Sequence, residues 1–161
     1  SEAFAILTHH KSNFSSLAYE PYLTLGVLIK SADSAEFLLC IQQRCDSVRL
    51  LEGETRSFLF LPFETTDKKF SIVFKEINGT HVKLKLKGDN CHNLITRHFN
   101  PSRQGLVFAR QNGRLFFEDI NGVRYDWILE LKESHAQSIA NKFAAQLSRV
   151  GLDESEWLRR S

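Results

Sequence analysis

Residues 37–63 read FLLCIQQRCDSVRLLEGETRSFLFLPF and place two apolar runs on either side of a polar centre. The first run, residues 37–41, is short and wholly apolar, which is typical of a strand buried on both faces. The second run, residues 57–63, predicts another strand with Pro62 near its end or on a sheet edge, because proline donates no hydrogen bond to a neighbouring strand. The polar residues between the runs carry the chain from one core strand to the next.

The clearest signal outside this stretch is a hairpin centred on Asn78-Gly79. Apolar and polar residues alternate along both of its arms, so the loop length decides which residues face each other. A three-residue loop sets Phe74 opposite Val82, whereas a two-residue loop would set Phe74 opposite Lys83 and mix the two faces. We therefore predict the three-residue loop, with Gly79 in the left-handed conformation.

The remaining pattern adds strands and a C-terminal helix. Strands are predicted at residues 22–30, with a bulge at Gly26, at 48–51, and in a three-stranded meander at 106–110, 115–119 and 123–131. Helical spacing predicts a helix that begins in the capping box Ser134-x-x-Gln137 and ends before Gly151, and then a second short helix. We expect an α+β fold in a single domain, residues 1–161. It is mostly antiparallel β, a partly closed sheet or barrel of hairpins and a meander, with the C-terminal helix packed on it.

Composition is that of an ordinary globular domain. The 161 residues are enough to bury a core, and a net charge of +2 is too small to indicate nucleic-acid binding by itself. Three cysteines at loose spacing favour a reducing compartment, and no apolar run approaches the roughly 20 residues of a membrane helix. We therefore expect a cytoplasmic chain without membrane contact. The chain starts at Ser1 and contains no Met, as expected of a domain excised from a longer protein or of a whole protein trimmed at its start.

The polar centre of the opening stretch is the first candidate site. Arg44, Cys45, Asp46 and Arg49 bring together a thiol, a carboxylate and two guanidiniums. Neighbouring guanidiniums favour a thiolate, so Cys45 and Asp46 are the candidate catalytic residues, with a histidine from elsewhere as general base. Arg44 and Arg49 are candidate binding residues. The competing interpretation is that Cys45 is a small buried residue and that Asp46 pairs with Arg49 to close a strand end.

A basic strand is the second candidate site. Lys83, Lys85 and Lys87 share one face of the second hairpin arm, and Arg97 and Arg103 in the following segment extend the positive charge. Such a surface can bind phosphates. Lysines are also a common protection of an exposed sheet edge, and the aromatic residues that would stack on bases fall on the opposite face.

No motif indicates a metal or a cofactor. The three cysteines form no C-x-x-C pair, and the adjacent Cys91-His92 is not a zinc-ligand spacing. Glu118 and Asp119 point to opposite faces of one strand, so they are poorly placed for a catalytic carboxylate pair, and Asp119 is better explained as the start of the Asn121-Gly122 turn. We predict no metal site and no cofactor.

Several segments resemble a poorly characterised bacterial domain found as an output or accessory module in response-receiver-like proteins. They are YLTLGVLIK (residues 22–30), LCIQQRCDSVRL (39–50), FLFLPF (58–63) and LSRVGLDESEWLRR (147–160). The resemblance implies a cytoplasmic bacterial setting in signalling or stress response, and it carries no catalytic residues.

Three functions are consistent with these patterns. The first is a non-enzymatic interaction or output module that contacts a protein partner, or other domains of its parent chain, through residues 43–49 and the C-terminal helices. The second is a nucleic-acid-binding module that uses the lysine strand. The third is a small Cys-dependent or metal-dependent enzyme centred on Cys45 and Asp46.

Overall fold

Antiparallel strands make up most of the regular secondary structure that the structure describes. The computed structural model describes residues 4, 9–12, 20–76, 78–88 and 94–160, and for 9–12 and 147–160 it gives the course of the backbone only. The strands are β1 (His9–Ser12), β2 (Val27–Ser31), β3 (Phe37–Cys40), β4 (Arg56–Thr65), β5 (Ile72–Lys75), β6 (His81–Leu86), β7 (Ile95–Phe99), β8 (Arg110–Asn112), β9 (Arg114–Glu118) and β10 (Arg124–Leu131). The helices are the short 3₁₀ helix η1 (Arg44–Asp46) and the long α2 (Glu133–Arg160). The predicted α+β class, mostly antiparallel β with a C-terminal helix, is confirmed.

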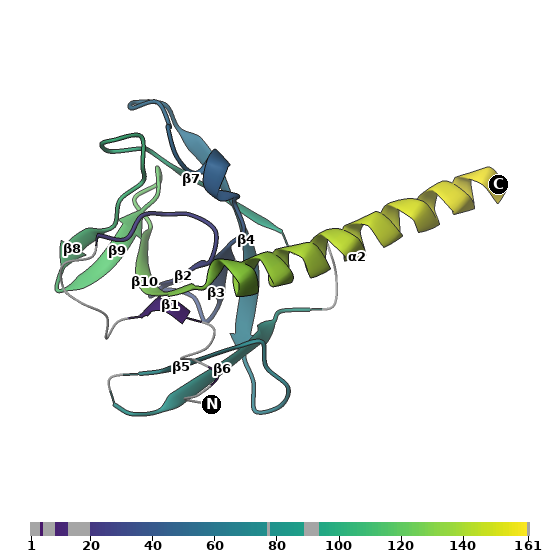
Figure 1. The fold of residues 1–161 in the computed structure, drawn as a ribbon, viewed down its shortest axis with the longest axis horizontal. Coiled ribbons are helices and arrows are strands. Elements are labelled where there is room, and N and C mark those ends of the chain that lie inside the picture. The colour runs from purple at the N-terminus through teal and green to yellow at the C-terminus, as the bar shows by residue number, and fades with distance from the viewer. Residues whose placement is uncertain (1–3, 5–8, 13–19, 77, 89–93, 161) are drawn as a thin grey trace.

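The sheet is open and forks at two of its strands. Its order is β5-β6-β4-β3-β2-β10-β9-β8, with β7 paired to β4 and β1 paired to β10. Along one edge of β4, residues 56–60 pair with β7 and residues 63–65 pair with β6. Along one edge of β10, residues 124–126 pair with β9 and residues 129–131 pair with β1. The sheet is therefore not closed into a barrel (Figure 1).

The central strands are buried on both faces and supply two apolar cores. The first core includes Leu39, Leu61 and Phe143, and the second includes Leu38, Phe60 and Trp127. In β3, Leu39 enters the first core and Leu38 enters the second, as the alternation of side chains along a strand requires. In β10, Trp127 and Leu129 lie in different cores, because a bulge between them shifts the register against β2. The predicted doubly buried strand is thus confirmed over residues 37–40, all of which are buried.

The hairpin has the predicted register. Ile72 pairs with Leu84 and Phe74 pairs with Val82, so the apolar face is continuous across β5 and β6. Gly79 has a φ of 86°, the left-handed conformation that the three-residue loop needs. The hydrophobic pattern therefore sets this register.

Four local strand predictions are wrong. The first strand of the meander was predicted at residues 106–110, but Leu106 and Phe108 form isolated bridges and β8 begins at Arg110. Residues 48–51 bend instead of extending, and Arg49 has a φ of 56°. Residues 22–26 lie outside β2, because Gly26, with a φ of 94°, turns the chain just before the strand. Pro62 lies inside a strand that is paired on both edges, at the point where β4 changes neighbour from β7 to β6. A missing N–H at that point interrupts neither ladder.

A single helix follows the sheet where two were predicted. α2 runs through Gly151 without a break, and it begins at Glu133 rather than at a Ser134 cap. A glycine inside a helix costs only about 1 kcal/mol relative to alanine, so it need not end one. Ala136, Ala140 and Phe143 are buried in the first turns, and Ala136 and Phe143 belong to the first core.

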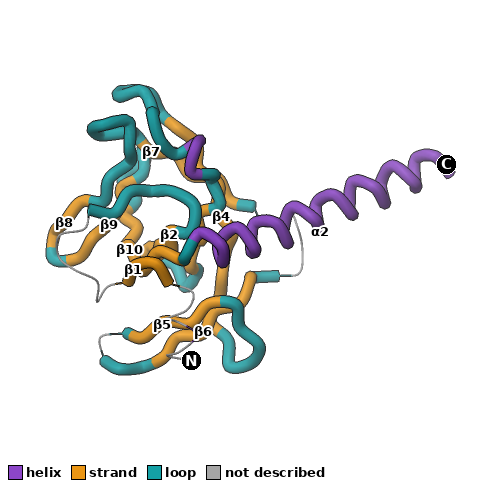
Figure 2. Tube along the Cα trace, in the orientation of Figure 1, coloured by secondary structure: helices purple, strands orange, loops and turns teal. Residues whose placement is uncertain are grey.

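The rest of α2 leaves the body of the molecule. Its 28 residues correspond to a length of about 42 Å. Figures 1 and 2 show the C-terminal half extending alone, away from the strands and loops. Among the described residues, no helix combines the length and the apolar character needed to cross a membrane.

Candidate functional site

The residues around Cys45 form an exposed turn. η1 folds residues 44–46, and the Ser47 hydroxyl donates to the Gln43 carbonyl at 2.7 Å. Cys45 and Asp46 are both exposed, so the interpretation of Cys45 as a buried residue is wrong. Among the described residues, no hydrogen bond joins the Cys45 thiol to a histidine and no ion pair joins Asp46 to Arg49. A catalytic role for Cys45 and Asp46 stays a prediction from sequence.

Arg44 connects this turn to the root of α2. Its Nη2 lies 3.8 Å from the Glu130 carboxylate at the end of β10, and its Nε lies 3.5 Å from the Glu133 carboxylate in the first turn of α2. Glu130 is only 2% exposed, so loss of Arg44 would remove a partner of a buried charge. Arg44 thus joins the two elements that were predicted to form a contact surface.

Gly105 fixes the end of the same loop. The Leu50 N–H donates to the Gly105 carbonyl at 3.0 Å, and a Cβ on Gly105 would lie 2.9 Å from the Cα of Arg49. Arg49 and Gln104 both have positive φ, 56° and 55° respectively, which is uncommon for residues other than glycine. The two loops therefore meet in a tightly constrained junction.

The lysine strand is engaged in contacts within the chain. Lys85 lies 3.6 Å from the Glu64 carboxylate, and Lys87 forms an ion pair with Glu36. The Lys83 ammonium lies 5.4 Å from the centre of the Phe70 ring. These contacts neutralise part of the positive charge on this face.

Arg103 and Arg97, which were predicted to extend that face, have different surroundings. The Arg103 guanidinium donates to Glu20 at 2.6 Å and lies 4.3 Å from the centre of the Phe108 ring. Arg97 lies on β7, which pairs with the first half of β4, whereas the lysine strand β6 pairs with the second half. These arginines therefore do not continue the positive charge of the lysine strand along one ladder of paired strands.

Arg97 instead lines a polar cleft of about 380 Å³. The β2–β3 turn, β7 and the β9–β10 turn form its walls, and a hydrogen bond from the Ile120 N–H to the His98 carbonyl, at 3.0 Å, holds β7 against the last turn. The charged, imidazole and phenol groups of the lining come from Asp33, Glu36, Arg97, His98, Asp119 and Tyr125. The volume falls within the roughly 300–1,000 Å³ typical of small-molecule sites.

A buried polar chain forms the base of this cleft. The Asp119 carboxylate accepts hydrogen bonds from the backbone N–H groups of Asn121 and Val123, at 2.9 and 3.0 Å, and from the Tyr125 hydroxyl at 3.4 Å. The Arg97 Nε donates to the same hydroxyl at 3.1 Å. Asp119 and Tyr125 are both buried, so these bonds hold the base of the cleft in one arrangement.

The environment of Tyr125 favours its neutral form. Burial raises the pKa of the Tyr125 hydroxyl above its usual value of 10.0, the nearby Arg97 guanidinium lowers it, and the Asp119 carboxylate raises it again. Burial is the largest of these effects, so the net direction is upward. The hydroxyl therefore serves as a fixed hydrogen-bond donor to Asp119.

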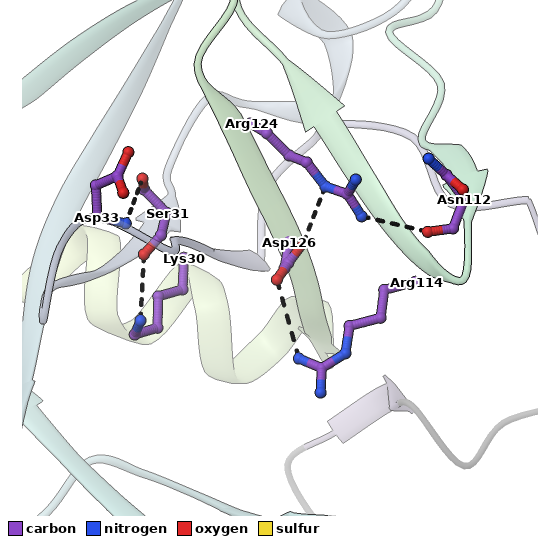
Figure 3. A network of polar contacts seen from close by, with 7 residues as sticks. All are labelled: Lys30, Ser31, Asp33, Asn112, Arg114, Arg124 and Asp126. Carbon is purple, nitrogen blue, oxygen red and sulfur yellow. Dashed lines mark hydrogen bonds and ion pairs between the residues drawn. The ribbon is translucent and has the colours of Figure 1, made fainter.

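A second hollow of about 460 Å³ adjoins the cleft and shares Asp33 with it. Asp126 is part of its lining, and Figure 3 shows Asp126 between Arg124 and Arg114, at 3.5 and 3.9 Å. The backbone N–H of Asp33 donates to the Ser31 hydroxyl at 3.3 Å. Within the described part of the chain, the Asp33 carboxylate itself has no hydrogen-bond or ion-pair partner.

Sequence reasoning found only part of this arrangement. Arg97 was a candidate, but it was expected beside the lysine strand. Tyr125 and Asp33 carried no signal, since a lone tyrosine in a strand and an aspartate in a turn are both common in any sheet. Asp119 was correctly predicted to open the Asn121-Gly122 turn.

The remaining chemical groups are the potential metal ligands and the buried Cys40 thiol. In the ranges that the structure covers, no three His, Cys, Asp or Glu residues are grouped closely enough to hold a metal ion. Burial raises the pKa of the Cys40 thiol to about 12, so Cys40 is not a nucleophile near neutral pH. Cys91 and His92 lie outside the described residues.

Comparison with protein-family models, with curated proteins and with solved structures found no match for this chain.

Proposed function

We propose that the chain is a non-enzymatic interaction module that contacts a protein partner, or other parts of a larger protein, through the projecting half of α2. The sequence resemblance adds a bacterial signalling or stress-response setting to this proposal. The observation that carries it is the course of α2, which continues well past the sheet (Figure 1).

A helical segment that extends away from the sheet gains little stability from packing against it. Isolated helices shorter than about 12–15 residues are marginal in water, because most helical stability in proteins comes from packing an apolar face. The buried residues of α2 with described side chains end at Phe143. Leu147, Val150, Trp157 and Leu158 follow in the sequence, and burial of such residues by a partner would stabilise the projecting helix.

The alternatives have weaker support. Nucleic-acid binding through the lysine strand would have to compete with the ion pairs of Lys85 and Lys87. Catalysis at Cys45 lacks a histidine base among the described residues, and the thiol lies in an exposed turn. The Arg44 ion pairs instead support the loop as part of the surface at the root of α2.

A pair of substitutions at one position tests this proposal. Gly151→Pro breaks the projecting half of α2, since proline inside a helix costs about 3 kcal/mol or more, whereas Gly151→Ala keeps the helix and strengthens it by about 1 kcal/mol. The two variants and the native chain are used as bait, and captured proteins are quantified by mass spectrometry. We expect Gly151→Pro to capture at least about tenfold less of the specific partners than the native chain does, and Gly151→Ala to retain their capture.

Thermal unfolding of the same variants is the control. Because the described burial of α2 ends at Phe143, neither variant should lower the melting temperature of the sheet. Equal capture by the proline and alanine variants, or no specific capture by the native chain, would contradict the proposed role of α2.

A further inference from the structure

The polar cleft offers two free groups of opposite charge in one small volume. Of its three carboxylates, that of Asp119 is saturated by three donors and that of Glu36 is paired with Lys87. The Asp33 carboxylate is left without a partner in the described part of the chain. Asp33 is thus the acidic group on the cleft wall that is open to a ligand.

Arg97 supplies the opposite charge. Its Nε donates to the Tyr125 hydroxyl at 3.1 Å and its Nη1 donates to the Thr96 carbonyl at 2.9 Å. These two bonds orient the guanidinium plane and leave Nη2 without a partner among the residues that the structure describes. A half-buried guanidinium whose Nη2 is free can donate a charge-assisted hydrogen bond to a carboxylate.

The charge pattern disfavours ligands with a single charge. A simple anion at Arg97 would share the cleft with the Asp33 and Asp119 carboxylates, and a simple cation at Asp33 would share it with the guanidinium. A ligand that carries both charges satisfies both walls. We propose that the cleft binds a small zwitterion such as a free α-amino acid, with its carboxylate at the Arg97 guanidinium and its ammonium at the Asp33 carboxylate.

The base of the cleft fits this role. The Tyr125 hydroxyl donates to Asp119 and accepts from Arg97, so it positions the guanidinium and does not compete for the ligand. The cleft volume of about 380 Å³ suits a ligand of this size rather than a macromolecule. This inference is independent of the role proposed for α2, which leaves from the other core.

Binding is tested on the full chain by NMR titration, with the backbone amides of Thr96 and Asn121 as reporters of the cleft. The probes are the twenty common amino acids, and then, for the best of them, its N-acetyl derivative, which lacks the ammonium, and its amide, which lacks the carboxylate. We expect saturable shifts for the free amino acid and at least about a tenfold loss of affinity for each blocked form, because each lacks one charge-assisted contact.

Variants assign the two ends of the ligand. Asp33→Asn should lower the affinity for the free amino acid at least about tenfold. It should leave the affinity for the N-acetyl derivative unchanged, because that derivative has no ammonium to contact Asp33. Arg97→Gln should lower the affinity for the free amino acid and leave the affinity for the amide unchanged. The matched controls Asp67→Asn and Arg110→Gln remove the same charges from exposed positions outside the cleft and should have no effect.

Three outcomes would overturn the inference. An N-acetyl derivative that binds as tightly as the free amino acid would make the cleft an anion site, and an amide that binds as tightly would make it a cation site. Failure of all twenty amino acids to shift either reporter would show that the cleft takes no such ligand. Because Asp33 is exposed, Asp33→Asn should fold normally, so the test does not depend on the half-buried Arg97.

Discussion

Replacing Gly105 with alanine should destabilise the protein by displacing the loop that carries Cys45. Gly105 has a φ of 66°, a conformation that costs other residues about 1–2 kcal/mol. The new methyl group would lie 2.9 Å from the Arg49 Cα and from the Leu50 nitrogen, and 3.0 Å from the Leu50 carbonyl oxygen. All three atoms belong to the main chain, so the backbone has to move, and overpacking of this kind costs about 1–3 kcal/mol. We expect a total loss of about 3 kcal/mol.

Gly113→Ala separates the two contributions. Gly113 has a similar φ of 76°, but a Cβ there would meet nothing within 4 Å. This variant should therefore lose only the conformational part, about 1 kcal/mol. The difference between the two variants measures the close approach of the loop around Gly105 to the Arg49–Leu50 backbone.

Urea unfolding of the native chain and both variants gives these free energies, provided that the transition slopes agree. For a chain of this size, about 1 kcal/mol corresponds to a shift of about 2–4 °C in melting temperature, which offers a second measurement. Equal losses for Gly105→Ala and Gly113→Ala would refute the close packing of the two loops.

Three further predictions concern single residues. In a Cys91→Ser background, a thiol reagent at pH 8 should label Cys40 about 1,000-fold more slowly in the folded chain than in the urea-unfolded chain, because a pKa of about 12 rather than 9.0 suppresses the thiolate; comparable rates would mean that Cys40 is not buried. The tyrosinate absorbance that disappears in Tyr125→Phe should develop above pH 10. Since the folded pKa exceeds the unfolded one, the stability that Tyr125 contributes is complete below pH 10 and falls as the pH rises further, and ionisation of Tyr125 below pH 10 would contradict this. Phe143→Ala should cost about 3–5 kcal/mol in urea unfolding, whereas Lys142→Ala on the exposed side should cost almost nothing; a small loss for Phe143→Ala would mean that α2 is not docked on the first core.

The strands were predictable where alternation of apolar residues decided the register. The β5–β6 pairing follows from keeping Phe74 opposite Val82, and the doubly buried β3 follows from an uninterrupted apolar run. These are local patterns, and the chain leaves them few alternatives. The same reasoning failed at Arg49 and Gly26, because backbone turns with positive φ leave little trace in hydrophobicity.

The forks of the sheet and the cleft were beyond sequence reasoning. β4 pairs with β6 and β7 along one edge, and although Pro62 lies where the partner changes, nothing local in residues 56–65 says which strands take the two halves. The cleft brings together Asp33, Arg97 and Tyr125 from three separate elements, so only the folded topology makes them neighbours. The predicted helix ended too early, because Gly151 was interpreted as the residue after a helix end. Glycine is nevertheless tolerated within helices at modest cost.

Site-specific photocrosslinking along α2 tests the interaction role most directly. A photoreactive amino acid is placed singly at each position from 147 to 158 of the full chain, expressed in the cells that make it, with position 78 in the β5–β6 turn as the control. We predict crosslinks to a defined protein whose yield rises and falls with the 3.6-residue period of the helix, as expected when one face is covered. A flat yield along α2 that does not exceed that of the control position would contradict the proposal that this helix is the contact surface.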